Sequence, residues 1–206
     1  MDLRAYSSVQ QKVLFTVVLI LALVMIYPLL WMISSSLKPE SLIFRELGLI
    51  PSQITLENYI QGWKGFSGIS FTTFFTNSFI IVAFAILGNL ISCSMAAYAF
   101  ARLQFDLKSL MFSIMFLSIM LPYHVVLIPQ YVMFHNLGWV NTFLPLIVPK
   151  FLATDAFFIF LMVQFIRGLP VELDNAARVD GCGPVQIFIR IIFPLLTPAL
   201  VTTSIF

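Results

Sequence analysis

The chain has 206 residues, of which 60% are hydrophobic and only 10% are charged, and its mean hydropathy is +1.00. Soluble domains carry roughly 25% charged residues, so this composition excludes an ordinary soluble globular domain and favours a protein of the lipid bilayer. The formal net charge of +2 is too small to indicate nucleic-acid binding, and Cys93 and Cys182 lack the spacing of a zinc site.

The first apolar run, Val13–Ile33, contains no charged residue. It is longer than the roughly 7–15 residues of a signal-peptide core, and no small-x-small cleavage site follows it closely. We therefore predict a retained membrane-spanning helix here, followed by a polar stretch over residues 34–70.

Four more apolar segments follow in chain order. They lie within Phe71–Ala101, at Ser109 to about Tyr131, at about Phe143–Ile166, and at Ile191–Phe206. A helix rises about 1.5 Å per residue, so each segment except the last is long enough to cross a hydrocarbon core of about 30 Å. The expected fold class is all-α, a polytopic membrane helix bundle.

The fifth segment is shorter than a full crossing unless residues before it are included, and it stops at TTSIF with no charge or polar cap. On this length argument we expect the sequence to be a fragment of a longer membrane protein.

Lysine and arginine in the short loops predict the orientation of the chain, because cytoplasmic loops carry an excess of them. With the N-terminus inside, the cytoplasmic set contains Arg4, Lys12, Arg102, Lys108, Arg167, Arg178 and Arg190, whereas only Lys38, Arg45 and Lys64 lie outside. This orientation gives a cytoplasmic N-terminus (1–12) and a membrane domain (13–206). Within that domain it predicts an external loop at about 34–70 and a cytoplasmic loop at about 167–190.

The cytoplasmic loop has the pattern of a short amphipathic helix. Pro170 suits its first turn, and Glu172 and Asp174 suit the positive end of its dipole. Residues on one predicted face are Leu173, Ala176, Ala177 and Asp180, and the breakers Gly181, Cys182, Gly183 and Pro184 follow. Pro194 and Pro198 predict a kink at the entry to the fifth span. Such a helix is either a connector or a handle for a cytoplasmic partner.

The loop resembles the cytoplasmic signature of permease subunits of ATP-binding-cassette importers, which reads EAA, three residues, Gly, and then an Ile/Leu–Pro pattern. In the sugar-importer version the matching residues are Pro170, Glu172, Leu173, Ala176, Ala177, Asp180, Gly181, Phe188, Ile191, Pro194, Leu195, Pro198, Ala199 and Leu200. Other stretches that resemble the maltose-type permease are SSSLKP, IPSQITLENY, AAYAFARLQF, LPYHVVLIPQY and NTFLPLIVP.

This resemblance implies a type I (MetI-like) importer permease with about five of its six transmembrane helices present, in a bacterial inner membrane. The motif residues expected to couple to the ATPase are Glu172, Leu173, Asn175, Ala176, Ala177, Asp180 and Gly181. Asn175 replaces the family's glutamate, which keeps hydrogen-bonding capacity but removes the charge. The alanine face and Gly181 are therefore expected to carry more of the docking than Asn175.

The resemblance also implies the partners: a cytoplasmic ATPase dimer, a second permease subunit, an external solute-binding protein and the lipid bilayer. The chain has no G-x-x-x-x-G-K-[ST] loop. We therefore expect ATP hydrolysis in a separate subunit, and no enzymatic activity or cofactor in this one.

Asp155 and His124 are candidate residues of the solute pathway, because polar groups inside spans are functional candidates. The alternative for Asp155 is a position near the outer interface or a pair with Lys150. For His124 it is a satisfied histidine of the bundle. Asn77, Asn89, Ser92 and Ser94 in the second span are candidates for hydrogen bonds between helices.

Three other interpretations remain open from the sequence. One is an importer permease for another solute, such as glycerol phosphate, an amino acid or a peptide. Another is a fragment that does not transport. The third is a secondary transporter, which predicts paired charges in mid-span, and only Lys150 and Asp155 approach that pattern.

Overall fold

The computed structural model describes residues 8–206. Arg4 and most of the predicted cytoplasmic segment 1–12 therefore lie outside the described residues. Within 8–206 the regular elements are helices, and the strand-like pairing there is an isolated bridge between Phe66 and Ile69. The predicted all-α class is confirmed. The chain divides into two compact units, 1–75 and 76–206.

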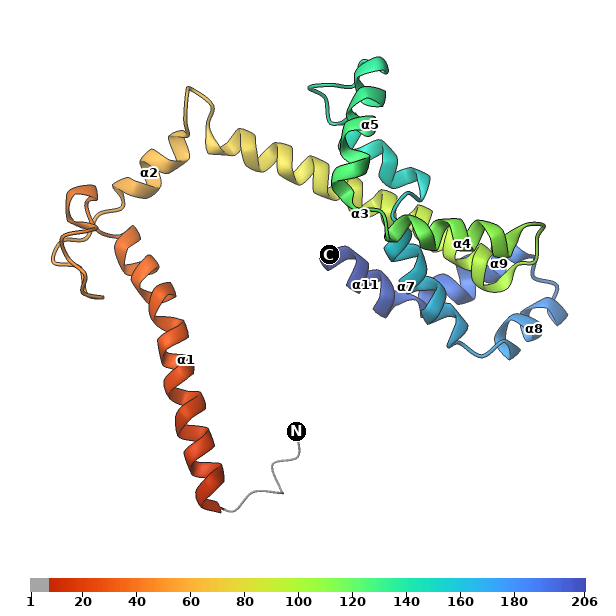
Figure 1. Ribbon diagram of the computed structural model, residues 1–206, viewed down its shortest axis with the longest axis horizontal. Coiled ribbons are helices and arrows are strands. Elements are labelled where there is room, and N and C mark those ends of the chain that lie inside the picture. Colours follow the sequence, from red (N-terminus) through yellow and green to blue (C-terminus); the bar gives the residue numbers. More distant parts are fainter. Residues whose placement is uncertain (1–7) are drawn as a thin grey trace. The chain divides into compact units, whose positions relative to one another are not determined.

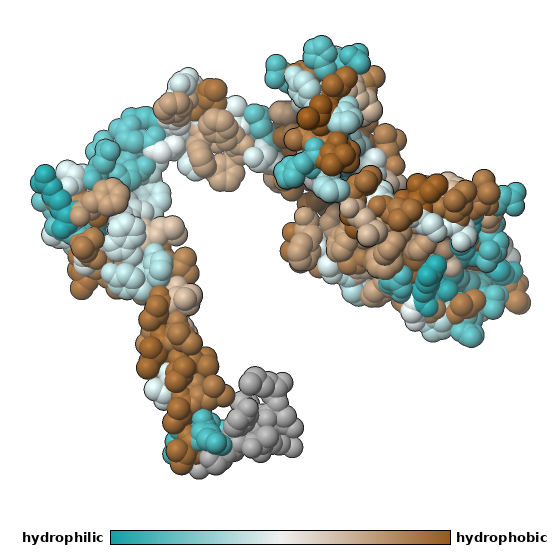
Figure 2. All heavy atoms as spheres, in the orientation of Figure 1, coloured by the Kyte–Doolittle hydropathy of each residue, from teal (hydrophilic) through white to brown (hydrophobic). Residues whose placement is uncertain are grey.

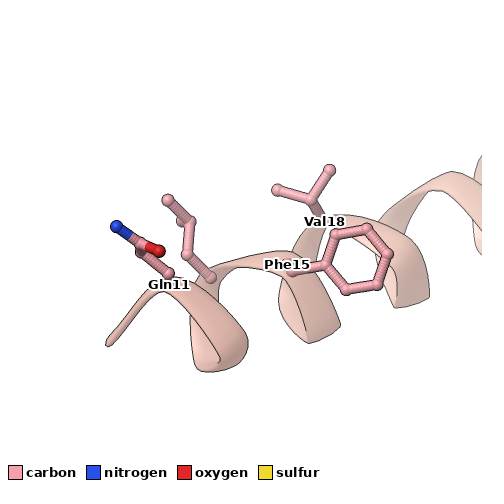
Figure 3. Close-up of a pocket in the computed structure, with 4 residues that line it drawn as sticks. Gln11, Phe15 and Val18 are labelled. Carbon is pink, nitrogen blue, oxygen red and sulfur yellow. The ribbon is translucent and has the colours of Figure 1, made fainter. Parts of the chain in front are cut away.

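The described part of the first unit contains α1 (Ser8–Ser36), η2 (Glu40–Leu42), α2 (Glu57–Lys64) and the first turn of α3 (Phe71–Arg102) (Figure 1). Hydrophobic side chains cover most of α1, as expected for a helix surrounded by lipid or other helices (Figure 2). A shallow hollow on this helix is lined by Gln11, Leu14, Phe15 and Val18, so it belongs to the apolar face of one helix (Figure 3).

The polar stretch after α1 is ordered around Lys38, whose side chain is fully buried. Its Nζ donates hydrogen bonds to the carbonyl oxygens of Glu46 (2.6 Å) and Gly48 (2.7 Å). The Asn58 amide donates to the carbonyl oxygens of Ser36 (2.9 Å) and Lys38 (2.7 Å). Backbone groups on both sides of the loop are thus satisfied by two side chains, which fixes a segment that has little regular structure.

The second unit begins within α3 and contains ten further helical elements. In chain order they are α4 (Lys108–Ile119), α5 (Tyr123–Asn136), α6 (Leu144–Ile147), η3 (Val148–Leu152), α7 (Ala156–Arg167), α8 (Glu172–Val179), α9 (Pro184–Ile187), η4 (Phe188–Ile192), α10 (Phe193–Leu195) and α11 (Thr197–Ile205). The core combines residues of α3, α7, α8 and the α9–α11 segment, among them Ala97, Met162, Ala177 and Leu196. Figure 1 shows α4, α7 and α9 gathered around the C-terminal part of α3.

Within residues 8–206, three helical stretches are long and apolar enough to cross a membrane: Val9–Ser36, Phe71–Arg102 and Leu144–Arg167. They correspond to the first, second and fourth predicted spans. The third and fifth predicted spans are bent pairs of helices, so the described residues hold up to five spans if each pair counts as one.

The third predicted span is not one continuous helix. Lys108–Ile119 and His124–Asn136 meet at an angle of 105°. Pro122 lies at the break, with φ −59° and ψ 130°. Proline lacks a backbone N–H and disfavours helical conformation in the residue before it, here Leu121, which explains the interruption.

The fifth predicted span also bends, by 68° between Pro184–Leu195 and Thr197–Ile205. Its preceding residues are helical from Pro184 onward, so the helical segment is longer than the apolar run alone. Phe188–Ile192 forms a π-helix, and the bend lies between Pro194 and Pro198. The prolines that predicted a kink here thus flank the observed one.

Candidate functional site

The helix predicted to couple to the ATPase is present as α8. Glu172 and Asp174 lie in its first turn and Arg178 in its last, each at the end of the helix dipole that favours its charge. The helix ends at Gly181, which has φ +83°. The Cys182 N–H donates to the Ala177 carbonyl oxygen (2.9 Å) and the Gly181 N–H to that of Arg178 (3.0 Å).

These two hydrogen bonds form a Schellman cap. Only glycine adopts a left-handed conformation without steric cost. A Cβ atom at Gly181 would meet no neighbouring atom within 4 Å. The glycine of the signature is therefore needed here for its backbone conformation, and not because the space is tight.

A buried ion pair joins α8 to the end of α3. Arg102 Nε lies 2.8 Å from Asp174 Oδ2, and the two side chains are only 7% and 3% exposed. Arg102 Nη2 also donates to the carbonyl oxygen of Leu169, at 2.7 Å, in the segment that precedes α8. Asp174 Oδ1 has no hydrogen-bond partner among the described residues. Arg102 thus fixes both the start of α8 and the approach to it.

The ion pair was not predicted from the sequence. Asp174 was interpreted as a first-turn acid and Arg102 as a marker of orientation. One signal was present: Asp174 and Ala177 are three residues apart and lie on the same face of a helix. Both are buried, and that face packs against the chain's own core.

Ala177, one of the residues expected on the docking face, lies against the core of this chain. It is 5% exposed, because it packs into the core cluster with α3, α7 and α9. The other predicted motif residues are exposed in this chain: Glu172, Leu173, Asn175, Ala176, Asp180 and Gly181. The four residues predicted to share one face therefore divide between the core (Ala177) and the surface (Leu173, Ala176, Asp180).

The second cluster of interest surrounds Asp155. Lys150 Nζ lies 2.7 Å from Asp155 Oδ2, which is the pairing given above as the alternative to a pathway role for Asp155. The Asn89 amide of α3 donates to the same oxygen at 2.7 Å, so Asn89 does hydrogen-bond between helices. The offset of five residues suits this pair because Lys150 and Asp155 are not in one helix. Ala153, with φ +54°, turns the chain between η3 and α7.

Close packing of α3 holds this turn in place. A Cβ atom at Gly88 would lie 2.8 Å from the Phe151 ring and 3.0 Å from the Lys150 carbonyl carbon, so only glycine allows the observed approach. Ser92 Oγ donates to the Lys150 carbonyl oxygen at 2.6 Å. Gly88, Asn89 and Ser92 therefore fix the Lys150 segment against α3.

A hollow of about 760 Å³ opens beside the pair, between α4, α5, α6, η3 and the start of α7. Its polar lining consists of Ser118, Gln130, Tyr131, Lys150, Thr154 and Asp155. His124, the other predicted pathway residue, lies in the first turn of α5 and is exposed, but it is not among the residues that line the hollow.

Proteins of known annotation and structure resemble the chain over most of its length. It is 36% identical over 180 residues to a putative ABC transporter permease protein of Caldicellulosiruptor sp., covering 87% of this chain and 64% of that protein. It is 34% identical to the arabinooligosaccharides transport system permease protein of Halalkalibacterium halodurans, covering 90% of this chain and 66% of that protein. The chain thus spans less than two thirds of the length of these relatives.

A solved structure shares the fold. A crystal structure of a bacterial ABC transporter involved in the import of the acidic polysaccharide alginate aligns with a TM-score of 0.84, over 97% of this chain and 70% of that chain, at 24% identity. The sequence profile of the family described as binding-protein-dependent transport system inner membrane component matches residues 88–206, a range that includes the Asp155 cluster and all of α8. The chain belongs to this family of membrane transport components.

Proposed function

We propose that the chain forms part of the solute pathway of an ATP-driven importer and couples to a cytoplasmic ATPase through α8. The observation that carries the proposal is the family profile over residues 88–206 together with the geometry of α8. This helix presents Leu173, Asn175 and Ala176 outward while Arg102 and the Schellman cap fix its position. A rigid helix with a free face suits docking in a groove of a partner.

The partners in this proposal are an ATPase dimer, a second permease subunit and an external solute-binding protein, and the N-terminus faces the cytoplasm. ATP is hydrolysed by the ATPase and not by this chain. Nucleotide drives transport by binding one conformation of the assembly more tightly than the other. His124 and Asp155 remain candidates for the pathway.

The proposed solute is a sugar or an oligosaccharide. Relatives with named solutes support this: the arabinooligosaccharide permease described above, and a trehalose transport system permease protein of Mycobacterium tuberculosis that is 36% identical over 86% of this chain. A permease for glycerol phosphate is the alternative, and uptake assays with both solutes distinguish the two.

Co-purification tests the docking. The tagged protein is extracted from membranes in mild detergent, and we expect an ATP-binding-cassette ATPase subunit to be retained with it. Asn175→Glu restores the acid of the family signature and should increase the retained fraction. Absence of the ATPase from both the natural protein and the Asn175→Glu variant would contradict the proposal.

A further inference from the structure

The Lys150–Asp155 pair lies deep in the proposed membrane domain. Asp155 directly precedes the 12 residues of α7, which end at Arg167, so it is about 18 Å of helix from that end. Asn89 precedes Arg102 by 13 residues, or about 20 Å. The two helices end together, since Arg102 donates to Leu169 just after α7. Both counts place the pair well inside a hydrocarbon core of about 30 Å.

Charged groups at this depth are costly and usually serve a pathway or a binding site. The pair is also not sealed in the core: the side chains of Lys150 and Asp155 are 33% and 25% exposed, and both line the hollow. Both charged groups can therefore hydrogen-bond with a molecule that enters the hollow.

We propose that this hollow binds an uncharged, polyhydroxylated solute through Lys150, Asp155 and Gln130. The inference rests on the proposed function and assigns the part of the pathway that this chain contributes. Its basis is the balance of charge: Lys150 and Asp155 are the charged members of the lining, and together they carry no net charge.

Charge balance decides between classes of solute. An anion loses its hydration when it enters the site. Lys150 attracts it but Asp155 repels it, so the site does not compensate for the free energy of that lost hydration. A neutral hydroxylated molecule only exchanges hydrogen bonds with water for hydrogen bonds with the site.

The donors and acceptors of the hollow also suit hydroxyl groups. A lysine ammonium has three N–H donors, of which Asp155 takes one. Lys150 and Asn89 both donate to Oδ2 of Asp155, and Oδ1 accepts no hydrogen bond from the described residues. Gln130 adds a donor and an acceptor, and the Tyr131 ring adds an aromatic surface beside them.

The test measures equilibrium binding to the complete transporter in lipid nanodiscs. The probes are the uncharged disaccharides galactobiose, arabinobiose and trehalose, and digalacturonate, which is the anionic counterpart of galactobiose. We expect at least one uncharged disaccharide to bind about tenfold or more tightly than digalacturonate, a difference comparable to one charge-assisted hydrogen bond.

Two substitutions change the charge of the site with little change in volume. Asp155→Asn leaves a net positive site and should shift the preference towards digalacturonate. Lys150→Met leaves a net negative site and should weaken the binding of all four probes. Ser204→Ala is the control: the Ser204 hydroxyl donates to the Leu200 carbonyl oxygen within α11 and does not line the hollow, so the selectivity of this variant should be that of the natural protein.

Binding of none of the uncharged disaccharides, or an unchanged selectivity in both Asp155→Asn and Lys150→Met, would overturn the site. ATPase retention is measured in parallel. If the protein binds sugars selectively but does not retain the ATPase, only the proposed coupling is overturned. If ATP-driven uptake occurs but Asp155→Asn and Lys150→Met leave the sugar selectivity unchanged, only the proposed binding site is overturned.

Discussion

Arg102 and Asp174 form a buried ion pair, with Nε and Oδ2 2.8 Å apart, between the end of the spanning helix α3 and the short helix α8. The pair connects the surface proposed to contact the ATPase with a helix that also carries Asn89 and hence the Asp155 cluster. The ion pair therefore links α8 to the helix whose Asn89 holds Asp155, a residue of the proposed solute site.

Removing one partner of this pair should strongly destabilise the second unit. Asp174→Ala leaves the Arg102 guanidinium buried without its carboxylate, and breaking a buried pair in this way costs about 3–5 kcal/mol. The measurement is thermal unfolding of the complete protein in detergent. We expect a markedly lower melting temperature for Asp174→Ala.

The double variant Arg102→Met with Asp174→Leu is the control for that experiment. It replaces the pair with apolar side chains and so leaves no uncompensated charge, which is often neutral for stability. Recovery of the melting temperature in the double variant supports the assigned pairing. Equal loss in the single and double variants would show that α8 is held mainly by other contacts.

Ala176 and Ala177 are adjacent but should respond differently to the same substitution. Ala177→Leu overpacks the core, where Ala177 is 5% exposed, and should cost about 1–3 kcal/mol of stability. Ala176→Leu changes only the exposed face of α8, so stability should be kept while ATPase retention falls. Melting temperature and co-purification, measured on both variants, check this. Normal retention with Ala176→Leu would exclude Ala176 from the docking surface.

The difference between these alanines shows what the sequence could and could not predict. The motif predicted the position of α8 and its termination at Gly181, because both depend on residues close together in the chain. It could not show which side of α8 faces the core, because that depends on Arg102 at the far end of another helix. The break at Pro122 was missed although proline itself is the local signal, since the apolar run around it has the length of one span.

The sequence could predict only the local part of the Asp155 cluster. Lys150 and Asp155 are close in sequence, so their pairing could be anticipated. Their contact with Asn89 requires the close approach of η3 to α3 at Gly88, which depends on packing across the unit.

Gly181 should tolerate a Cβ atom less well than its neighbour Gly183. Gly181→Ala places a side chain on a residue with φ +83°, and left-handed conformation costs roughly 1–2 kcal/mol for other residues. Gly183→Ala is the matched control, since Gly183 has φ −75° and open space around its Cβ position. Thermal unfolding should show a loss for the first variant only. Equal melting temperatures would mean that the cap does not contribute to the stability of α8.

Glu46, in the loop after α1, should make the stability of the first unit depend on pH in the acid range. Hydrogen bonds from the Ser52 hydroxyl and N–H lower the pKa of its carboxyl group below the ordinary value of 4.5, and Lys38 adds a smaller effect. Because the pKa of Glu46 is lower in the folded state than in the unfolded state, its carboxylate stabilises the folded unit fully at pH values above the unfolded-state pKa. This stabilisation is lost as the pH falls through the folded-state pKa. Ser52→Ala removes the hydroxyl and should raise the Glu46 pKa towards 4.5. Titration of a ¹³C-labelled Glu46 carboxyl by NMR in both proteins checks this. The same midpoint in both would show that the Ser52 hydroxyl does not stabilise the carboxylate.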